Sequence, residues 1–525
     1  MKTATQSGEP RANARPAQAC VTPAEGSSKM HSRPRIVESR RTFLKKVVIS
    51  ACGPLILTPC FSADYYEADP LRRAARDSFP KPNWFQDWDR SFDFHQISVG
   101  TKTVRYYRSK PTNVKEPAIL LIHGTPGGPE VWWPVLLGDG ATYGLAVNYD
   151  VIVIELPGHG TSTEMFCDSN LLGIELIGHR SFDYYSQFCT RILDAIVPAN
   201  KPTIIVGHSY GGEMAWRMVS ANPSRYKGLM IIDSSGFKRD KNKELSGADK
   251  ETIKFWNRVG QDLSDTAFVG PILRVPFMKW IGVSKAIKET EPGIKPYYAD
   301  TNKVNGALVE THKLFMTHSS RLETAMSLTR RSVYREDRAD VRAEIERLRQ
   351  AIATNRWPSV RVISGDSDHF FTQTNQVANF IQALGFDNDG RIRARVQVDQ
   401  TRNAAHCPHE EQPEEIAFRI SDLAETCFRD NGATWLSEYE FTAYDISVDK
   451  WPDVGGVYIL SKMDPQNHWV PLYIGQTQSF RLLLSHELCE EARKLGVTHI
   501  HVRMIQREAT RAETERKFLQ AYPPR

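Results

Sequence analysis

The chain has few cysteines, eight in 525 residues, and no two of them are spaced as C-x-x-C. That spacing is typical of structural zinc sites and of thioredoxin-like redox sites, so the sequence favours neither class. Cys167 and Cys189 flank one region of the chain and could form a disulfide in an oxidising compartment. Sequence spacing alone leaves this pairing open.

Long apolar runs are also lacking. Beyond residue 63, no segment approaches the roughly 20 consecutive apolar residues that span a bilayer, so we expect no transmembrane span in the mature protein. Positive charge is concentrated in residues 1–46, where ten Lys or Arg stand against three Glu, while the whole chain carries a net charge of only +5. The remainder therefore lacks the broad basic surface that is typical of proteins that bind polyanions.

The amino terminus contains a basic segment followed by an export signal. Residues 1–38 are rich in Ala, Pro, Ser and Arg without apolar periodicity, which predicts a disordered basic region. Residues 39–45, S-R-R-T-F-L-K, resemble the twin-arginine (Tat) motif, and residues 47–61 supply a modest apolar stretch. We therefore interpret residues 39–63 as a signal peptide.

The signal implies the Tat export machinery as a partner and a periplasmic or secreted protein. Processing is left open between a lipoprotein-type site at Cys52 or Cys60 and ordinary cleavage after Ala63. The location is cytoplasmic if the signal is not used.

The most informative motif is Gly207-His208-Ser209-Tyr210-Gly211. It follows a strand-like run at 203–206 and precedes a helix-like run at 213–219. A sharp strand-to-helix turn needs glycine on both sides of the serine, because Cβ atoms there would collide with neighbouring elements. This context predicts a nucleophile elbow with Ser209 as the nucleophile.

A carboxylate is expected next in the chain, because hydrolases of this kind place the acid between the serine and the histidine. Asp368 follows the predicted strand 360–364 at its carboxyl end, where open parallel sheets place functional groups. We predict that Asp368 is the acid. Asp366, two residues earlier, and Asp233, after the predicted strand 229–232, remain alternatives.

A histidine then follows the predicted strand 396–398. His406 lies where the general base is expected, and a neutral imidazole there would take the hydroxyl proton of Ser209 while Asp368 fixes its tautomer. We assign His409 a structural role.

An oxyanion hole needs two backbone N–H groups, one from the residue after the nucleophile and one from the loop after an early strand. Tyr210 supplies the first. The run 117–122 predicts the early strand, and it ends in His123-Gly124-Thr125-Pro126-Gly127-Gly128, so Thr125 is the candidate for the second.

Together these motifs resemble the α/β-hydrolase superfamily over residues 78–430. The resemblance rests on H-G-T-P-G-G, E-L-P-G-H-G-T-S, G-H-S-Y-G-G, G-D-S-D and A-H-C-P-H-E-E-Q-P-E, in that order. It implies an α/β fold and a serine hydrolase that cleaves an ester, amide or related acyl bond of a small molecule through an acyl-enzyme, without a cofactor. The first loop is similar to that of proline iminopeptidases and related esterases, although Thr125 stands where many peptidases carry Gly. The roughly 130 residues between Asp233 and Asp368 predict a helical cap at about 237–355, which would shape the substrate pocket.

A second module is predicted after the boundary at 429–432. Strand-like runs at 456–460 and 470–475, followed by helical segments at 480–495 and 510–522, predict a small α+β domain at 440–525.

This module resembles the GIY-YIG nuclease-like family. The resemblance rests on Gly456-Val457-Tyr458 and Tyr473-Ile474-Gly475, with His486 and Glu515 after them. It implies a nuclease site at Tyr458, Tyr473, Arg481 and His486, with Glu515 binding Mg²⁺. Arg481 comes before the usual arginine position, which holds leucine here, so a nucleic-acid partner is left open.

The sequence thus leaves three hypotheses. The first is a serine hydrolase that uses Ser209, Asp368 and His406. The second is a non-catalytic hydrolase-like binding protein. The third is a bifunctional protein with Mg²⁺-dependent nuclease activity in its carboxyl-terminal domain.

Overall fold

The computed structural model describes residues 85–99, 102–111, 115–125, 127–138, 144–156, 159, 182–234, 290–304, 306–316, 339–354, 358–368, 377–386, 388–428, 432–435, 439–448, 451–484 and 486–523. The predicted basic region 1–38 and signal peptide 39–63 lie outside these residues. Within them, no helix combines the length and the apolar character that crossing a membrane requires.

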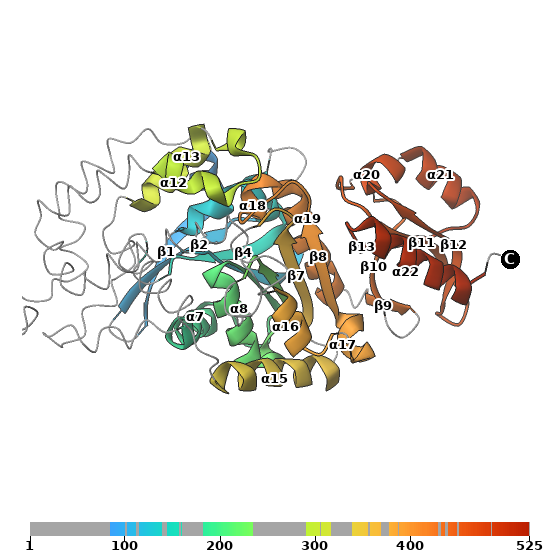
Figure 1. Cartoon of the computed structure of the whole chain (residues 1–525), viewed down its shortest axis with the longest axis horizontal. Coiled ribbons are helices and arrows are strands. Elements are labelled where there is room, and N and C mark those ends of the chain that lie inside the picture. Colours follow the sequence, from blue (N-terminus) through green and yellow to red (C-terminus); the bar gives the residue numbers. More distant parts are fainter. Residues whose placement is uncertain are drawn as a thin grey trace, which may run out of the picture. The chain divides into compact units, whose positions relative to one another are not determined.

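An eight-stranded mixed sheet organises residues 92–401 (Figure 1). Its strands are β1 Phe92–Val99, β2 Lys102–Ser109, β3 Lys115–Ile122, β4 Tyr149–Ile154, β5 Thr203–His208, β6 Gly228–Ile232, β7 Ser359–Gly365 and β8 Val396–Thr401. Their order is β1-β2-β4-β3-β5-β6-β7-β8; β2 pairs antiparallel with β1 and β4, and all the other pairs are parallel. This is the strand order expected of an α/β-hydrolase fold. The carboxyl ends of β3, β5, β6, β7 and β8 therefore lie at one edge of the sheet.

Helices cover both faces of this sheet, whereas Ile294 of α12 and Val309 of α13 pack in a separate cluster with Cys407. The helices are α4 Phe85–Ser91, α5 Trp133–Leu137, α6 Leu145–Asn148, α7 Phe182–Ile196, α8 Tyr210–Ala221, α12 Thr290–Ile294, α13 Gly306–Met316, α15 Ala339–Thr354, α16 Ala378–Ala383, α17 Gly390–Arg395, α18 Pro408–Glu411 and α19 Pro413–Phe428, with short 3-10 turns at Pro129–Trp132, Pro223–Arg225, Lys295–Tyr297 and Thr301–Lys303. Strands β4, β5 and β6 are buried along their whole length, which is why they read as continuous apolar runs.

Neighbouring strand residues point into two different cores. Ile205 packs in the cluster that α7, α8 and α15 cover, whereas Ile204 packs in the cluster that α5 and α19 cover. The period of two along each strand thus divides one apolar run between two helix layers.

Part of the predicted cap belongs to the helix layer of the sheet. Leu348 and Ile352 of α15 are four residues apart and fully buried in the cluster that contains α8. Glu344 on the same helix accepts a hydrogen bond from Arg217 of α8 at 2.7 Å. The predicted cap boundary near residue 355 is therefore too late, because an amphipathic helix that packs on the sheet also gives a helical pattern. Of the predicted cap, residues 237–289, 305 and 317–338 lie outside the described part of the chain.

A second, five-stranded sheet follows α19. Its strands are β9 Gly432–Trp435, β10 Tyr439–Asp445, β11 Gly456–Met463, β12 Trp469–Thr477 and β13 His499–Met504, and its helices are α20 Phe480–Leu483, α21 His486–Lys494 and α22 Glu508–Ala521. The order is β12-β11-β13-β10-β9, and each pair is antiparallel. The strand-like runs at 456–460 and 470–475 correspond to β11 and β12.

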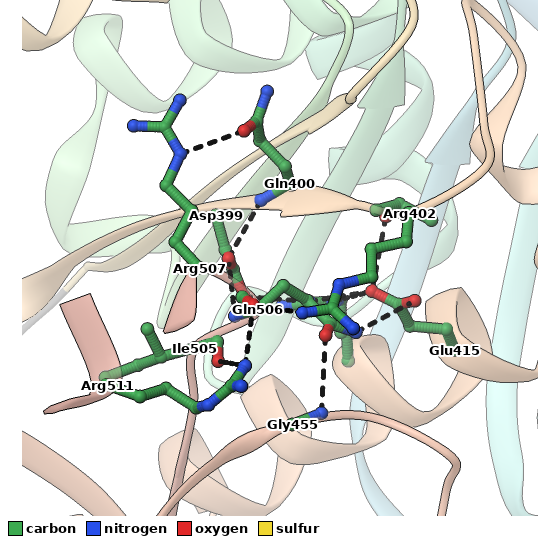
Figure 2. A network of polar contacts seen from close by, with 11 residues as sticks. Asp399, Gln400, Arg402, Glu415, Gly455, Ile505, Gln506, Arg507 and Arg511 are labelled. Atoms are coloured by element: carbon green, nitrogen blue, oxygen red, sulfur yellow. Dashed lines mark hydrogen bonds and ion pairs between the residues drawn. The ribbon is translucent and has the colours of Figure 1, made fainter. Parts of the chain in front are cut away.

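A buried polar network joins this second sheet to β8 and α19 (Figure 2). The backbone N–H of Gln506, which follows β13, donates to both carboxylate oxygens of Asp399 on β8, at 3.0 and 3.2 Å. Arg419 of α19 donates to Asp399 at 2.8 Å, and Arg402 donates to the Gln506 carbonyl at 2.9 Å. Strand β8 leads directly into the loop that carries His406, so the second sheet holds the start of that loop.

Candidate active site

Ser209 lies in the sharp turn between β5 and α8. Its backbone has φ 54°, the left-handed region that non-glycine residues rarely adopt, and its N–H donates to the Ile232 carbonyl at 2.9 Å. A Cβ at Gly207 would collide with the Gly211 backbone, and a Cβ at Gly211 would collide with the carbonyls of residues 122 and 123. Both glycines are therefore required by close approach, as the sequence analysis expected of an elbow.

His406 lies between Ser209 and Asp368. Its Nε2 is 3.1 Å from Ser209 Oγ, and its Nδ1 is 3.4 Å from Asp368 Oδ2. All three residues are buried. The structure thus brings together the predicted nucleophile, base and acid from positions up to 197 residues apart.

The two alternative acids occupy different places. Asp366 is exposed, and its carboxylate accepts the N–H groups of Asn403 at 3.2 Å and Ala404 at 3.4 Å, so it braces the turn after β8. Asp233 is fully buried at the end of β6, and both of its oxygens lie 3.2 Å from the Gly365 nitrogen. Asp368 is the carboxylate that faces the His406 ring.

The side chain of His208, inside the elbow motif, contacts the backbone of the predicted base, His406. Its Nε2 lies 2.7 Å from the His406 carbonyl oxygen, so this nitrogen donates. Burial, together with His409 and His406, holds the pKa of His208 well below its usual range, so the ring is neutral. This role of His208 could not be predicted from the sequence, because a contact that spans 198 positions leaves no local signal.

His409 packs between two rings. Its centroid lies 4.3 Å from that of His208 and 4.7 Å from that of Trp132, and burial lowers its pKa from 6.5 to about 3. This neutral, enclosed ring is consistent with the structural role expected from the sequence.

The loop with the proposed second oxyanion donor lies beside the elbow. A Cβ at Gly124 would come within 2.9 Å of Ser209 Cβ, so only glycine lets the loop approach this closely. Thr125 Oγ1 is 3.0 Å from His159 Nε2, and the Leu156 N–H donates to His123 Nε2 at 3.2 Å. These contacts join the H-G-T loop to the segment after β4. Tyr210, the other proposed donor, begins α8.

A segment that the sequence analysis missed braces the His406 loop. The His406 N–H donates to the Tyr297 carbonyl at 2.9 Å, and the Tyr298 hydroxyl donates to Glu410 at 2.7 Å. Glu411 accepts the N–H groups of Ala299 at 2.8 Å and Ala405 at 2.6 Å. The paired glutamates of the H-E-E-Q-P-E motif were the available signal, because buried carboxylates in a loop need donors.

Two cysteines near these elements are free and buried, Cys189 and Cys407. Burial raises the pKa of Cys189 to about 12 and that of Cys407 well above its usual range, so both are thiols. The pairing of Cys189 with Cys167 is therefore not formed in this structure. Cys167 itself lies outside the described residues.

In the second sheet, the structure brings together only part of the predicted nuclease site. Tyr458 on β11 and Tyr473 on β12 have ring centroids 5.8 Å apart. Glu515 on α22 accepts a hydrogen bond from Gln476 at 2.8 Å. Burial, Tyr473 and Glu515 all raise the pKa of Tyr458, so less of it is in the phenolate form that a general base requires than of a free tyrosine.

Arg481 points elsewhere. Its guanidinium pairs with Glu414 of α19 and donates to the Trp451 carbonyl at 3.3 Å. Nothing is described of the His486 side chain, and no group of three or more His, Cys, Asp or Glu side chains in the described part could hold a metal ion. Arg481 is thus engaged on α19 in this structure.

A protein-family model agrees with the fold. The model of the alpha/beta hydrolase family matches residues 119–420, more than half of the chain. Among solved structures, the chain is similar to wild-type Cfl2 from Burkholderia cenocepacia (15% identity, 64% of this chain and 96% of that chain, TM-score 0.45). It is also similar to a membrane phospholipase A, a bacterial virulence factor (17%, 74% and 99%, TM-score 0.42), and to the epoxide hydrolase CorEH (14%, 63% and 97%, TM-score 0.43). At these values the structural likenesses carry no argument about activity, and no curated protein sequence matches the chain.

Proposed function

The chain belongs to the alpha/beta hydrolase family, and from this premise we propose that it is a serine hydrolase that cleaves an ester, amide or related acyl bond of a small molecule. One observation carries the proposal. His406 lies 3.1 Å from Ser209 Oγ on one side and faces Asp368 on the other, inside a buried site. A serine in the elbow, rather than an aspartate, favours an acyl-enzyme.

The first half of the reaction forms the acyl-enzyme. An ionised Asp368 accepts from His406 Nδ1–H, which leaves Nε2 as the acceptor of the Ser209 proton. Ser209 Oγ attacks the acyl carbon, and the carbonyl electrons move onto oxygen to give a tetrahedral oxyanion. Backbone N–H groups of Tyr210 and Thr125 are the proposed donors to that oxyanion. Collapse breaks the bond to the leaving group, which takes the proton from His406 Nε2.

The second half releases the acid. Water gives a proton to His406 Nε2 as its oxygen attacks the acyl carbon, and a second tetrahedral oxyanion forms. Collapse breaks the bond to Ser209 Oγ, which takes the proton back from His406. The side chains and backbone groups supply every nucleophile and proton transfer, so the proposed reaction requires no cofactor.

Covalent labelling tests the proposal. We expect a fluorophosphonate probe to label the intact protein, and Ser209→Ala to abolish labelling and the turnover of short acyl esters. Ser224→Ala is the matched control, because Ser224 is an exposed serine close to the carboxyl end of α8. Undiminished labelling of Ser209→Ala would exclude this nucleophile. If the intact protein neither reacts with the probe nor hydrolyses esters, the chain is instead a hydrolase-like binding protein.

For residues 440–525 we propose a structural role in the same enzyme. Two contacts support it: Arg481 pairs with Glu414 of α19, and the Gln506 N–H donates to Asp399 of β8. We expect no Mg²⁺-dependent nicking of plasmid DNA by the intact protein. Glu515→Ala and the neighbouring exposed control Glu513→Ala should both hydrolyse esters at the unchanged rate. Nicking that Glu515→Ala loses and Glu513→Ala keeps would establish the bifunctional alternative.

We also propose export through the twin-arginine route, which rests on Arg40 and Arg41 in the amino-terminal sequence. Replacing both with Lys should retain the protein in the cytoplasm on cell fractionation. The control replaces Arg33 and Arg35 with Lys in the preceding basic region. Export of the Arg40/Arg41 variant at the normal level would contradict the proposal.

A further inference from the structure

Two buried carboxyl groups follow neighbouring strands at the edge that carries the site, although a catalytic site of this kind uses one. Asp233 follows β6 and is fully buried, and Asp368 follows β7 with 3% of its surface exposed. Strands β6 and β7 are parallel neighbours, with Ile232 opposite Ile363, so their carboxyl ends bring the two residues to adjacent positions. Both side chains are therefore buried at the same edge of the sheet.

The backbone fixes Asp233 in that position. Its N–H donates to the Ile363 carbonyl at 3.0 Å, and the Gly365 nitrogen lies 3.2 Å from each of its carboxyl oxygens. The Gly365 carbonyl in turn accepts from the Asp368 N–H at 3.4 Å. Asp233 has φ 41°, a conformation that a non-glycine residue adopts only when its surroundings hold it. The backbone N–H and C=O of one glycine thus contact both acids.

Two carboxylates cannot both be ionised there. Burial disfavours the charged form, and the ionisable groups that act on Asp233 are Asp368 and Glu411, which are both acidic. The neighbouring Cys407 is a neutral thiol. These effects and a hydrogen bond to Asp368 raise the pKa of Asp233 well above its usual range, against the single opposing N–H of Gly365. These effects favour one shared proton on the pair, the arrangement that two carboxyls sharing a site adopt in other enzymes.

We propose that Asp233 is a protonated positioning residue that donates a hydrogen bond to Asp368, so that a single charged carboxylate faces His406. The inference rests on the proposed serine hydrolase function and assigns Asp233 a part in it. The donated bond fixes the rotamer of Asp368 and takes part of its negative charge. Asp368 then orients His406 as the single charged carboxylate of the pair.

Two substitutions at one position test the inference through the pH profile of ester hydrolysis. Asp233→Asn is neutral and isosteric, and its amide can donate to Asp368 while its oxygen accepts from Gly365. We expect its kcat/KM to stay within about threefold of the parent, with the acidic limb of the profile unmoved. Asp233→Ala removes the donor, so we expect kcat/KM to fall by about tenfold and the acidic limb to move to higher pH.

The opposite result has a clear form. If Asp233 were ionised in the parent, Asp233→Asn would remove a negative charge near His406 and move the acidic limb to lower pH by about one unit. That shift would overturn the inference.

A spectroscopic measurement keeps the test independent of folding and of activity. The infrared spectrum of the parent should contain a band from a buried protonated carboxyl that is absent from Asp233→Asn and present in Ser209→Ala. Identical carboxyl bands in the parent and Asp233→Asn would also overturn the inference. Failure of the proposed function would look different, because the parent itself would not label with a fluorophosphonate.

Discussion

The site at the carboxyl edge of the eight-stranded sheet and the site around the tyrosine pair of the second sheet were both predicted from short motifs. They differ in how many of the predicted residues the structure brings together. In the first, Ser209, His406 and Asp368 converge within hydrogen-bonding reach. In the second, Tyr458 and Tyr473 are neighbours, but Arg481 pairs with Glu414 on another element. A motif predicts a site only when the topology delivers every member to the same place.

The physical difference lies in how the strands end. Parallel β5, β6, β7 and β8 all finish at one edge, so residues that follow them meet there whatever their separation in sequence. In the antiparallel second sheet, the tyrosines lie on facing strands β11 and β12, whereas the arginine lies on the short helix α20. The position of a one-turn helix depends on its tertiary contacts. Here Arg481 of α20 contacts Glu414 of α19.

The largest expected effect separates the acid at the sheet edge from its neighbour. Asp368→Asn should reduce kcat for ester hydrolysis by about 10⁴-fold, because the amide no longer stabilises the imidazolium or fixes its tautomer. Asp366→Asn is the matched control, and it should stay within about threefold because Asp366 is exposed and the amide oxygen can still accept one of its two N–H donors, Asn403 or Ala404. Equal losses in the two variants would contradict the assignment of the acid.

The sequence predicted the elbow and the base well, because steric need at Gly207 and Gly211 and the chain order leave few choices. It could not separate Asp368 from Asp233, since both follow strands that end at the same edge. It also could not show that α15 packs on α8, because a cap helix and a sheet-covering helix share one apolar period. The partner of Arg481 could not be predicted from the sequence, because Glu414 is 67 positions away and no local pattern links the two residues.

The next effect tests whether the two sheets are one cooperative unit. Asp399→Ala removes the carboxylate that accepts from Gln506 and from Arg419, both buried, and leaves the guanidinium of Arg419 without this partner. We expect the free energy of unfolding to fall by about 3–5 kcal/mol. Asp453→Ala, at an exposed position in the connection before β11, should change it by less than about 0.5 kcal/mol.

Calorimetry distinguishes the outcomes for Asp399→Ala. If the Asp399 network couples the sheets, the parent unfolds in one transition, and the variant unfolds at lower temperature or in two transitions. Two transitions in the parent, with the variant shifting neither, would show that the sheets fold independently.

A smaller effect compares the buried histidines of the two sheets. Burial lowers the pKa of His409, beside the elbow, and of His501, in β13, to about 3 each. In the unfolded chain these rings take up protons below about pH 6.5, so their contribution to stability is complete above that pH and falls as the pH drops toward 3. His409→Phe and His501→Phe should each reduce the slope of unfolding free energy against pH by up to about 1.4 kcal/mol per unit in this window. The exposed His468→Phe should leave the slope unchanged, and a slope equal to the parent's in all three variants would show that the rings are solvated.

The smallest expected effect concerns Arg481, which contacts α19. The pair of Arg481 and Glu414 is about half exposed, so Arg481→Ala should cost less than about 1 kcal/mol of unfolding free energy, and ester hydrolysis should be unchanged. A double-mutant cycle with Glu414→Ala isolates the pair, and a coupling energy above zero would assign Arg481 to the contact between α20 and α19. Loss of Mg²⁺-dependent DNA cleavage in Arg481→Ala, with no coupling to Glu414, would place the arginine in a nuclease site instead. The second sheet would then carry chemistry of its own, and the contrast with the sheet edge at Ser209 would disappear.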